Sequence, residues 1–210
     1  MFSGIIEAVG SLESLVRTGA GARMIVDVRA LAVLPAPGDS VAVDGACLTV
    51  EQVKGTRVEL ALSEETLQKT RFAALRRGAR LNIERAVRAD QALHGHIVTG
   101  HVDGMADVVR VQRGHDSTVV EFSVDRRFET MIVPKGSVAI NGVSLTVASL
   151  SGRAFSVALV PYTLRNTNLP DLSTGDRAHF EADIIGKYVL RYLSTLPITR
   201  DDLRERGFDG

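Results

Sequence analysis

The sequence has no tryptophan, a single cysteine and no excess of either charge. One thiol has no partner for an intramolecular disulfide, which fits a protein of the reducing cytosol, so we expect a cytoplasmic location. Lys+Arg and Asp+Glu are equal at 25 each, without the basic excess of nucleic-acid-binding proteins. No apolar run reaches the ~18 residues of a membrane span, and the start, MFSGIIEAVG, lacks the charged region of a secretory signal. We therefore expect neither a nucleic-acid partner nor a membrane partner.

Motifs of nucleotide-binding and hydrolytic enzymes are missing as well. The chain has no GxGxxG or Walker loop, no Gly-x-Ser-x-Gly elbow and no HExxH, so these functions find no support. His94, His96 and His101 cluster in LHGHIVTGHVDG, and zinc sites pair histidine with cysteine or carboxylates at tight spacing. His96 and His101 are five residues apart in a strand-like run, on opposite faces, so we expect no metal site.

What the sequence does contain is a duplication. Residues Ser40–Val50 read SVAVDGACLTV and residues Ser137–Val147 read SVAINGVSLTV, an offset of 97 positions (144 − 47). The same offset relates LALSEETLQKT at Leu60–Thr70 to VALVPYTLRNT at Val157–Thr167. A period of this length is too long for a solenoid unit and is typical of a small domain. We therefore predict two copies of one fold in tandem.

The repeats divide the chain into three parts. We predict one barrel over residues 1–93, a second over 94–185, and a C-terminal helix and tail over 186–210. Short alternating runs such as Arg23–Val28, RMIVDV, are separated by turn signals such as Asp44-Gly45. Many short strands with glycine turns and one small helix favour an all-β fold of closed barrels over an open sheet.

Each repeat contains a short segment in which a helix has to be considered. Ser63–Lys69 is expected to form one or two helical turns, with the Ser63 hydroxyl as N-cap. Pro161 interrupts the corresponding segment of the second copy, where we expect a looser turn.

The end of the chain has the spacing of an amphipathic helix. The apolar residues recur at i, i+4, i+7 and i+11: Ile185, Val189, Tyr192 (or Leu193) and Leu196. Pro197 would end this helix, and the charged residues 199–210 would form a loose tail. The apolar face would serve either as an oligomer contact or as a lid over its own barrel.

Several residues are candidates for chemistry. Cys47 and its duplicate Ser144 are small potential nucleophiles just after a glycine turn, although a lone cysteine is more commonly a buried structural residue. Thr49 and Thr146 lie two residues further on and share their strand faces. His101 is either an acid–base group, since imidazole titrates near neutral pH, or a surface residue in a turn.

Lys135 and Asp183 have simple structural interpretations. Lys135 lies in a PKG turn, where a lysine is commonly solvated, and Asp183 precedes the terminal helix, where it can act as N-cap. Residue type alone favours these structural roles.

The motifs together resemble a known family. MFSGIIE, GACLTV, GVSLTV, HGHIVTGHVDG, the ETL and YTL segments and DIIGKYV closely resemble riboflavin synthase of the single-chain α type, in the right order from Met1 to about Leu193. The resemblance implies two tandem homologous six-stranded Greek-key barrels plus a C-terminal α-helix that drives homotrimer formation. It leaves open whether the chain associates with lumazine synthase.

The implied reaction is the dismutation of two molecules of 6,7-dimethyl-8-ribityllumazine. One molecule gives a four-carbon unit to the other, which yields riboflavin and 5-amino-6-ribitylamino-uracil. The resemblance implies one lumazine site in each barrel, the N-terminal barrel of one subunit facing the C-terminal barrel of a neighbour. It implies no metal and no cofactor.

The resemblance also assigns catalytic residues. Phe2, Ser40, Cys47 and His101 would line the N-terminal site, and Lys135, Ser144, Thr146 and Asp183 the C-terminal one. His101 with Thr146 would remove a proton from a C7 methyl, and Ser144, Cys47 or a water would add at C7 of the other ring.

Further residues would contact ring and ribityl groups. In the first copy these are Gly4, Ile5, Ile6, Leu48, Thr49, Ala61, Leu62, Ser63, Glu64, Glu65, Thr66 and Asn82. In the second copy they are Gly100, Val102, Leu145, Ala158, Leu159, Val160, Pro161, Tyr162 and Thr163, together with His101, Lys135, Ser144 and Thr146. The sequence departs from the family pattern at Ser3, Tyr162 and His179.

The main alternative is a non-catalytic lumazine- or flavin-binding antenna protein with the same duplicated fold. In such proteins the catalytic positions of the second half are degraded. This chain keeps Cys47, His101, Lys135, Ser144 and Asp183, which favours the enzyme. A flavin reductase would need a nicotinamide domain, and the glycine fingerprint of one is missing.

Overall fold

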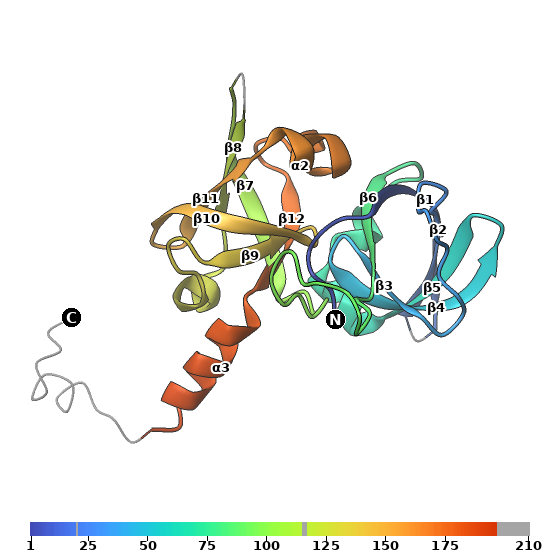
Figure 1. Cartoon of the computed structure of the whole chain (residues 1–210), viewed down its shortest axis with the longest axis horizontal. Helices are drawn as coiled ribbons and strands as arrows, with labels where there is room; N and C mark the ends of the chain where they lie inside the picture. The colour runs from blue at the N-terminus through green and yellow to red at the C-terminus, as the bar shows by residue number, and fades with distance from the viewer. Residues whose placement is uncertain (20, 115–116, 197–210) are drawn as a thin grey trace, which may run out of the picture.

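The computed structural model describes residues 1–19, 21–114 and 117–196, and in these it contains two closed barrels of antiparallel strands (Figure 1). The strands of the first barrel are β1 (Ala8–Thr18), β2 (Gly21–Asp27), β3 (Ser40–Val43), β4 (Ala46–Lys54), β5 (Arg57–Ser63) and β6 (Arg80–Arg85). They pair in the order β1-β2-β5-β4-β3-β6, and β6 pairs back onto β1. The long connection of a Greek key runs from β2 to β3, and β2 therefore pairs with β5 instead of with β3.

The second barrel repeats this arrangement. Its strands are β7 (Gly104–Arg113), β8 (Thr118–Ser123), β9 (Ser137–Ile140), β10 (Val143–Ser151), β11 (Ala154–Leu159) and β12 (Arg177–Ala182). Read from β7, the pairing order is β7-β8-β11-β10-β9-β12, which is the order of the first barrel with every strand number raised by six. The predicted duplication of a six-stranded barrel is confirmed.

Each barrel has its own apolar core. Met24, Val26 and Val28 are buried, as the alternation in Arg23–Val28 predicted. The core of the second barrel is more aromatic, with the rings of Phe122 and Phe155 stacked at 5.6 Å between centroids. Burial of each such side chain contributes roughly 1.5–3 kcal/mol, so both barrels are stabilised mainly from within.

The barrels meet at two equivalent tight turns. The turns Asp44-Gly45 and Asn141-Gly142 have positive φ at both residues, as type I′ hairpins require. A Cβ on either glycine would lie 2.6 Å from the backbone nitrogen of the other. Glycine at both positions therefore lets the two backbones touch.

Two short helices follow β5 and β11. In α1 (Glu64–Lys69) the Ser63 hydroxyl accepts a hydrogen bond from the Thr66 N–H, which confirms the predicted cap. The looser turn expected at Pro161 is wrong, because Pro161 begins α2 (Pro161–Asn166). At the first helical position its missing N–H costs nothing and its fixed φ suits the helix. Short 3₁₀-helices occur at η1 (Phe72–Ala74), η2 (Arg126–Met131) and η3 (Leu169–Asp171).

The terminal helix α3 (Ile184–Leu193) is shorter than predicted. Asp183 caps its start, with the carboxylate accepting from the Ile185 N–H at 3.0 Å. The helix ends before Leu196 because the hydroxyls of Ser194 and Thr195 bind the Arg191 and Tyr192 carbonyls, in competition with continuing helical bonds. Pro197 and the predicted tail lie outside the described residues.

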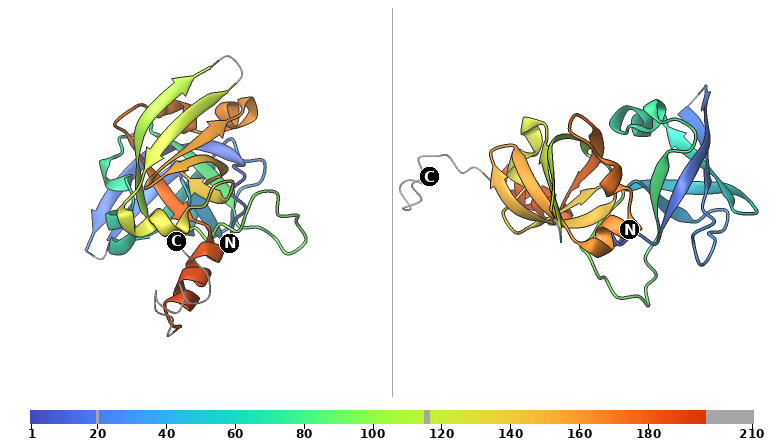
Figure 2. Two further views of the ribbon diagram at one scale, coloured as in Figure 1. Left: turned by 90° about the vertical axis from the view of Figure 1, so that its left-hand side faces the viewer. Right: turned by 90° about the horizontal axis from the view of Figure 1, so that it is seen from above.

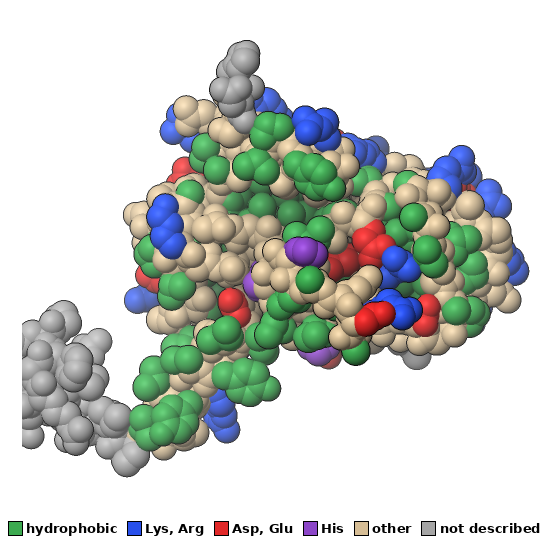
Figure 3. Space-filling model, in the orientation of Figure 1, with side chains coloured by type: hydrophobic (Ala, Val, Ile, Leu, Met, Phe, Trp, Pro, Cys, Tyr) green, Lys and Arg blue, Asp and Glu red, His purple; other side chains and the backbone are tan. Residues whose placement is uncertain are grey.

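Helix α3 extends away from both barrels (Figures 1 and 2), so a lid over its own barrel is wrong. Its first turn packs on η2, where Gly186 approaches the Met131 carbonyl. Apolar side chains cover much of the face of the helix that is in view (Figure 3), and Tyr188 is 72% exposed. No helix in the described part of the chain is long and apolar enough to cross a membrane.

The segments that lead into the two barrels, residues 1–7 and 98–103, pair with each other and are called the leading segments. Phe2 and Val98 form an isolated antiparallel bridge, with N···O distances of 2.7 and 3.1 Å. Both side chains are fully buried between the barrels. The predicted boundary between residues 93 and 94 falls in the connection that precedes this bridge. The strand-like run predicted around His96–His101 becomes a strand only at Gly104.

Candidate active site

The first barrel carries an open cavity of about 400 Å³, at the place where the leading segment of the second barrel lies against it. Three elements form it: the start of β4, helix α1 and residues 100–102. The lining residues are Ala46, Cys47, Glu65, Thr66, Lys69, Thr70, Gly100, His101 and Val102. The structure therefore brings together Cys47, Glu65, Thr66, Gly100, His101 and Val102, all of which were predicted site residues.

Cys47 and His101 reach this cavity from different repeats. The tight turn at Asp44-Gly45 starts β4, so Cys47 follows it directly, and its side chain is partly exposed. The Cys47 N–H donates to the Gly100 carbonyl at 2.8 Å. This bond docks the segment carrying His101 against the first barrel, and the exposed His101 lines the same cavity as Cys47.

Two buried carboxylates hold the leading segments. The Glu181 carboxylate accepts hydrogen bonds from the Thr99 N–H, the Thr99 hydroxyl and the Gly100 N–H. Glu84 accepts the same three bonds from Ser3 and Gly4. Loss of hydration on burial raises the pKa of Glu181 and raises that of Glu84 to about 7, against the lowering by their donors.

On the second barrel, the Ser144 hydroxyl is hydrogen-bonded to a histidine. The His96 Nδ1 atom and the Ser144 Oγ atom lie 2.7 Å apart, and His96 is 9% exposed. Burial is the main cause that lowers the pKa of His96, and the charge of Asp183 acts the other way. A neutral imidazole results, which can accept the serine proton at Nδ1. The His96 Nε2 atom is buried without a hydrogen-bond partner.

The leading segments are exchanged between the barrels, and this corrects the predicted grouping. Gly4, Ile5 and Ile6 were placed with the N-terminal site, but the Ser144 N–H donates to the Gly4 carbonyl at 2.8 Å, and Ile6 packs on the second core. Conversely, Gly100 and Val102 were grouped with the second copy but line the first-barrel cavity. The two segments pair with each other at the Phe2–Val98 bridge, and the bonds from Ser144 and Cys47 then hold each segment on the opposite barrel.

Some residues that were predicted to contact the substrate have side chains inside the barrels. Four of their side chains lie in the barrel cores: Leu48, Leu62, Leu145 and Leu159. Because successive strand residues alternate faces, only their backbones are available to a ligand. Phe2 is fully buried against Val98, behind the cavity rather than in its lining.

Other predicted residues lie on exposed strand and turn surfaces. Ser40 pairs with Thr49 in the first barrel, and Thr146 pairs with Ser137 in the second. Lys135 has φ +64°, and its ammonium donates to the Ala148 carbonyl at 3.3 Å. The remaining predicted contacts are exposed or half-exposed at the ends of β5 and β11 and in the first turns of α1 and α2: Ala61, Ser63, Glu64, Ala158, Val160, Pro161, Tyr162 and Thr163.

Comparison with known proteins identifies the family. The lumazine binding domain model matches the chain twice, over residues 3–86 and 99–183. Riboflavin synthase of Actinobacillus pleuropneumoniae is 34% identical over 99% of this chain and 100% of its own length. Those of Bacillus subtilis (33%; 99% and 100%) and Mycobacterium tuberculosis (34%; 92% and 98%) are similar at the same level. The chain belongs to the riboflavin synthase family.

Solved structures show the same fold at lower identity. LumP complexed with riboflavin matches this member of the riboflavin synthase family with a TM-score of 0.78 and 22% identity, over 87% of this chain and 99% of that one. LumP complexed with flavin mononucleotide matches with a TM-score of 0.74 and 24% identity, over the same shares. At this identity the likeness establishes the double-barrel fold.

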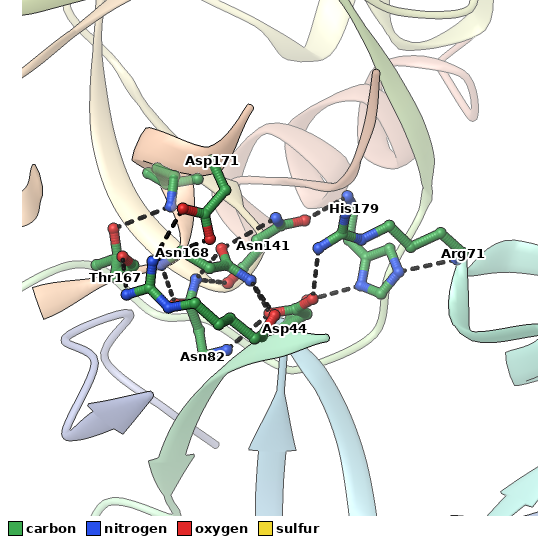
Figure 4. Close-up of polar contacts among 10 residues, drawn as sticks. Asp44, Arg71, Asn82, Asn141, Thr167, Asn168, Asp171 and His179 are labelled. Atoms are coloured by element: carbon green, nitrogen blue, oxygen red, sulfur yellow. Dashed lines mark hydrogen bonds and ion pairs between the residues drawn. The ribbon is translucent and has the colours of Figure 1, made fainter. Parts of the chain in front are cut away.

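Asn82 was predicted to contact substrate, and that prediction is wrong. Asn82 and His179 are buried between the barrels in a polar network with Asp44, Asn141 and Asn168 (Figure 4). Burial lowers the pKa of His179 to about 4. The departure from the family pattern at His179 therefore lies in the interface between the barrels.

Sequence reasoning missed His96, Glu84 and Glu181 as parts of the site. A signal for the two glutamates was present, because Leu81–Glu84 and Ala178–Glu181 are equivalent in the repeats and end in a charge on a buried strand. For His96 the repeats offered no such signal. Among residues 1–19, 21–114 and 117–196, no three His, Cys, Asp or Glu side chains gather as a metal site.

Proposed function

We propose that this chain catalyses the dismutation of two 6,7-dimethyl-8-ribityllumazine molecules into riboflavin and 5-amino-6-ribitylamino-uracil. The proposal rests on one observation. Cys47 and His101 line the same open cavity on one barrel, while Ser144 and His96 are hydrogen-bonded on the other. Both halves thus keep a nucleophile and an imidazole. Full-length similarity to riboflavin synthases supports the same function.

The two sites differ in a way that suits a dismutation. Identical substrates must play different roles, one as donor and one as acceptor of four carbons. In the first site His101 follows Gly100, whereas in the second Ile5 follows Gly4 at the equivalent place. The exchange of leading segments thus gives the first cavity an imidazole from the second repeat.

We propose Ser144 as the nucleophile that adds at C7 of one lumazine. The neutral His96 accepts the hydroxyl proton at Nδ1 as the oxygen attacks, which is general base catalysis, worth roughly 10²–10⁴ in rate. Cys47 and a bound water are the alternatives. His101 takes a proton from the acidic C7 methyl of the other lumazine, with Thr146 as its partner.

His101 lies in the first-barrel cavity, whereas Thr146 lies on the second barrel, so this partnership implies assembly. Within one chain, Cys47 and Ser144 bond to Gly100 and Gly4, which lie two residues beyond the buried Phe2–Val98 bridge in their respective segments. We propose a homotrimer in which the first barrel of one subunit faces the second barrel of a neighbour. The exposed apolar face of α3 would hold the subunits together. Holding two rings in register in this way can contribute ~7–11 kcal/mol.

The test is to mix the pure protein with 6,7-dimethyl-8-ribityllumazine and follow riboflavin by its yellow absorbance. Riboflavin and the uracil product should appear in equal amounts without added metal or cofactor. Tight binding of the lumazine without turnover would instead indicate an antenna protein. Light scattering of the same sample measures the trimer, and co-elution with lumazine synthase measures that association. We further propose a cytoplasmic location, which fractionation of cells would test.

A further inference from the structure

The two buried glutamates make equivalent contacts, one in each repeat. Glu181 lies on β12 and accepts from the Thr99 N–H at 2.7 Å, the Thr99 hydroxyl at 2.7 Å and the Gly100 N–H at 3.0 Å. The bonds continue to the next residue, because the Thr99 hydroxyl oxygen accepts from the His101 N–H at 3.3 Å. A chain of hydrogen bonds thus runs from Glu181 to the backbone of His101.

The first repeat contains the same chain of bonds. Glu84 accepts from the Ser3 N–H at 2.7 Å, the Ser3 hydroxyl at 2.8 Å and the Gly4 N–H at 3.0 Å. The Ser3 hydroxyl then accepts from the Ile5 N–H at 3.3 Å. Ser3, one of the departures from the family pattern, therefore performs the function that Thr99 performs in the second repeat.

The far ends of both segments are fixed as well. The Asp103 carboxylate accepts from the Ala182 N–H at 2.9 Å and pairs with the Lys187 ammonium of α3 at 2.6 Å. Glu7 does the equivalent in the first repeat, accepting from the backbone N–H of Arg85 at 3.1 Å and pairing with its guanidinium at 2.8 Å. Each segment is therefore clamped at two points to the last strand of its own repeat.

Each clamp serves the site of the opposite barrel. The segment that Glu181 holds gives its Gly100 carbonyl to the Cys47 N–H and places His101 in the first-barrel cavity. The segment that Glu84 holds gives its Gly4 carbonyl to the Ser144 N–H. Residues of one barrel thus control the geometry of the reacting groups on the other.

We propose that Glu181, acting through Thr99, is the positioning residue for His101 in the first-barrel site, and that Glu84, acting through Ser3, is its counterpart for the Ser144 site. This inference rests on the proposed function for its effect on turnover. Glu181 does not line the cavity that holds Cys47 and His101, so it acts through Thr99 and is not a catalytic residue.

The test compares Glu181→Gln with Glu84→Gln, using Cys47 as a reporter. Cys47 is the only cysteine of the chain, so the rate at which iodoacetamide alkylates the protein reports on the first site alone. A glutamine amide would point an N–H at one of the donors that the carboxylate now accepts from. Glu181→Gln should change the alkylation rate and lower kcat by roughly tenfold or more, because small misplacements of reacting groups are costly. Glu84→Gln should lower kcat and leave Cys47 alkylation as in the wild type.

Thr99→Val provides a second variant that removes only the hydroxyl, in case Glu181→Gln does not fold. It should reproduce the change in alkylation and in kcat, and Thr99→Ser should restore both, since serine performs this function at position 3. Equal effects of Glu181→Gln and Glu84→Gln on alkylation, or full kcat in Thr99→Val, would overturn the inference. If the wild type makes no riboflavin, the proposed function fails, and alkylation alone still decides the positioning.

Discussion

Asn82 and His179 occupy equivalent positions on β6 and β12, and each accepts a hydrogen bond from a backbone N–H of the other barrel. The Asn82 Oδ1 atom accepts from the Asn168 N–H at 2.7 Å, and the His179 Nε2 atom accepts from the Arg71 N–H at 2.9 Å. His179 Nδ1 donates to the Asp44 carbonyl at 2.8 Å. With one ring nitrogen accepting and the other donating, the imidazole must be neutral in the folded protein.

This geometry predicts an acid-sensitive interface between the barrels. The pKa of His179 is about 4 in the folded protein against 6.5 ordinarily, chiefly because the ring is desolvated. Below pH ~6.5 the unfolded chain therefore binds a proton that the folded chain does not. The stability present above pH 6.5 is lost as the pH falls towards 4, by about 3 kcal/mol. His179→Asn should remove this loss, as measured by urea unfolding between pH 4.5 and 7.5.

An exposed histidine gives the matched control for that measurement. His94 lies on the surface, and His94→Asn should retain the acid-dependent loss of the wild type. If His179→Asn had the same pH dependence as His94→Asn, protonation of His179 would not be what weakens the interface.

The contact between the two tight turns predicts a second effect on stability. Gly142→Ala would put a Cβ 2.6 Å from the Gly45 nitrogen at a residue with φ +77°, so the barrels must separate or the turn must change. We expect a loss of at least ~3 kcal/mol, at the upper end for single substitutions. Gly55→Ala is the control: φ is +60° and nothing lies within 4 Å, so only the ~1 kcal/mol cost of the left-handed conformation applies. Equal losses in urea unfolding would exclude the contact as the cause.

The barrel fold could be read from the sequence because its signals are local. The alternation in Arg23–Val28 and the Asp44-Gly45 turn each specify a strand or a hairpin within a few residues, and the repeat at positions 47 and 144 doubles the evidence. The prediction of a looser turn at Pro161 was wrong because proline disfavours helix interiors but suits the first helical position. Capping by Ser63 and Asp183 was predictable for the same local reason.

The site could be predicted only in part because it is assembled from distant segments. Cys47 and His101 are 54 residues apart (101 − 47) and meet only because residues 99–103 cross to the first barrel. The bridge that sets this crossing joins Phe2 to Val98, and no periodic pattern encodes such a pairing. His96 was missed because its contact with Ser144 depends on the same crossing.

Removal of the His96 imidazole should separate catalysis from folding. His96→Ala removes the imidazole nitrogen that lies 2.7 Å from the Ser144 hydroxyl, and with it the proposed general base, so we expect kcat to fall roughly 10²-fold or more. A small cavity should cost about 1–2 kcal/mol of stability. Ser144→Ala should lower kcat as much, and the double variant should be no worse than either single one, since the two groups act as a unit. Independent, multiplying effects on riboflavin formation would contradict this pairing.

The exposed face of α3 allows a test of whether turnover requires assembly. Tyr188 and Tyr192 are 72% and 65% exposed on one stripe of the helix, and Tyr188→Glu would place a charge in any apolar interface there. We expect a monomer by light scattering, with the thermal transition of each barrel little changed, because α3 contributes little to either core. Riboflavin formation should then fall steeply, since Cys47 and Ser144 of one chain dock on opposite ends of the buried Phe2–Val98 bridge. Arg191→Gln, on the same helix outside the apolar stripe, should remain assembled and active. A fully active Tyr188→Glu monomer would mean that both lumazines react within one chain.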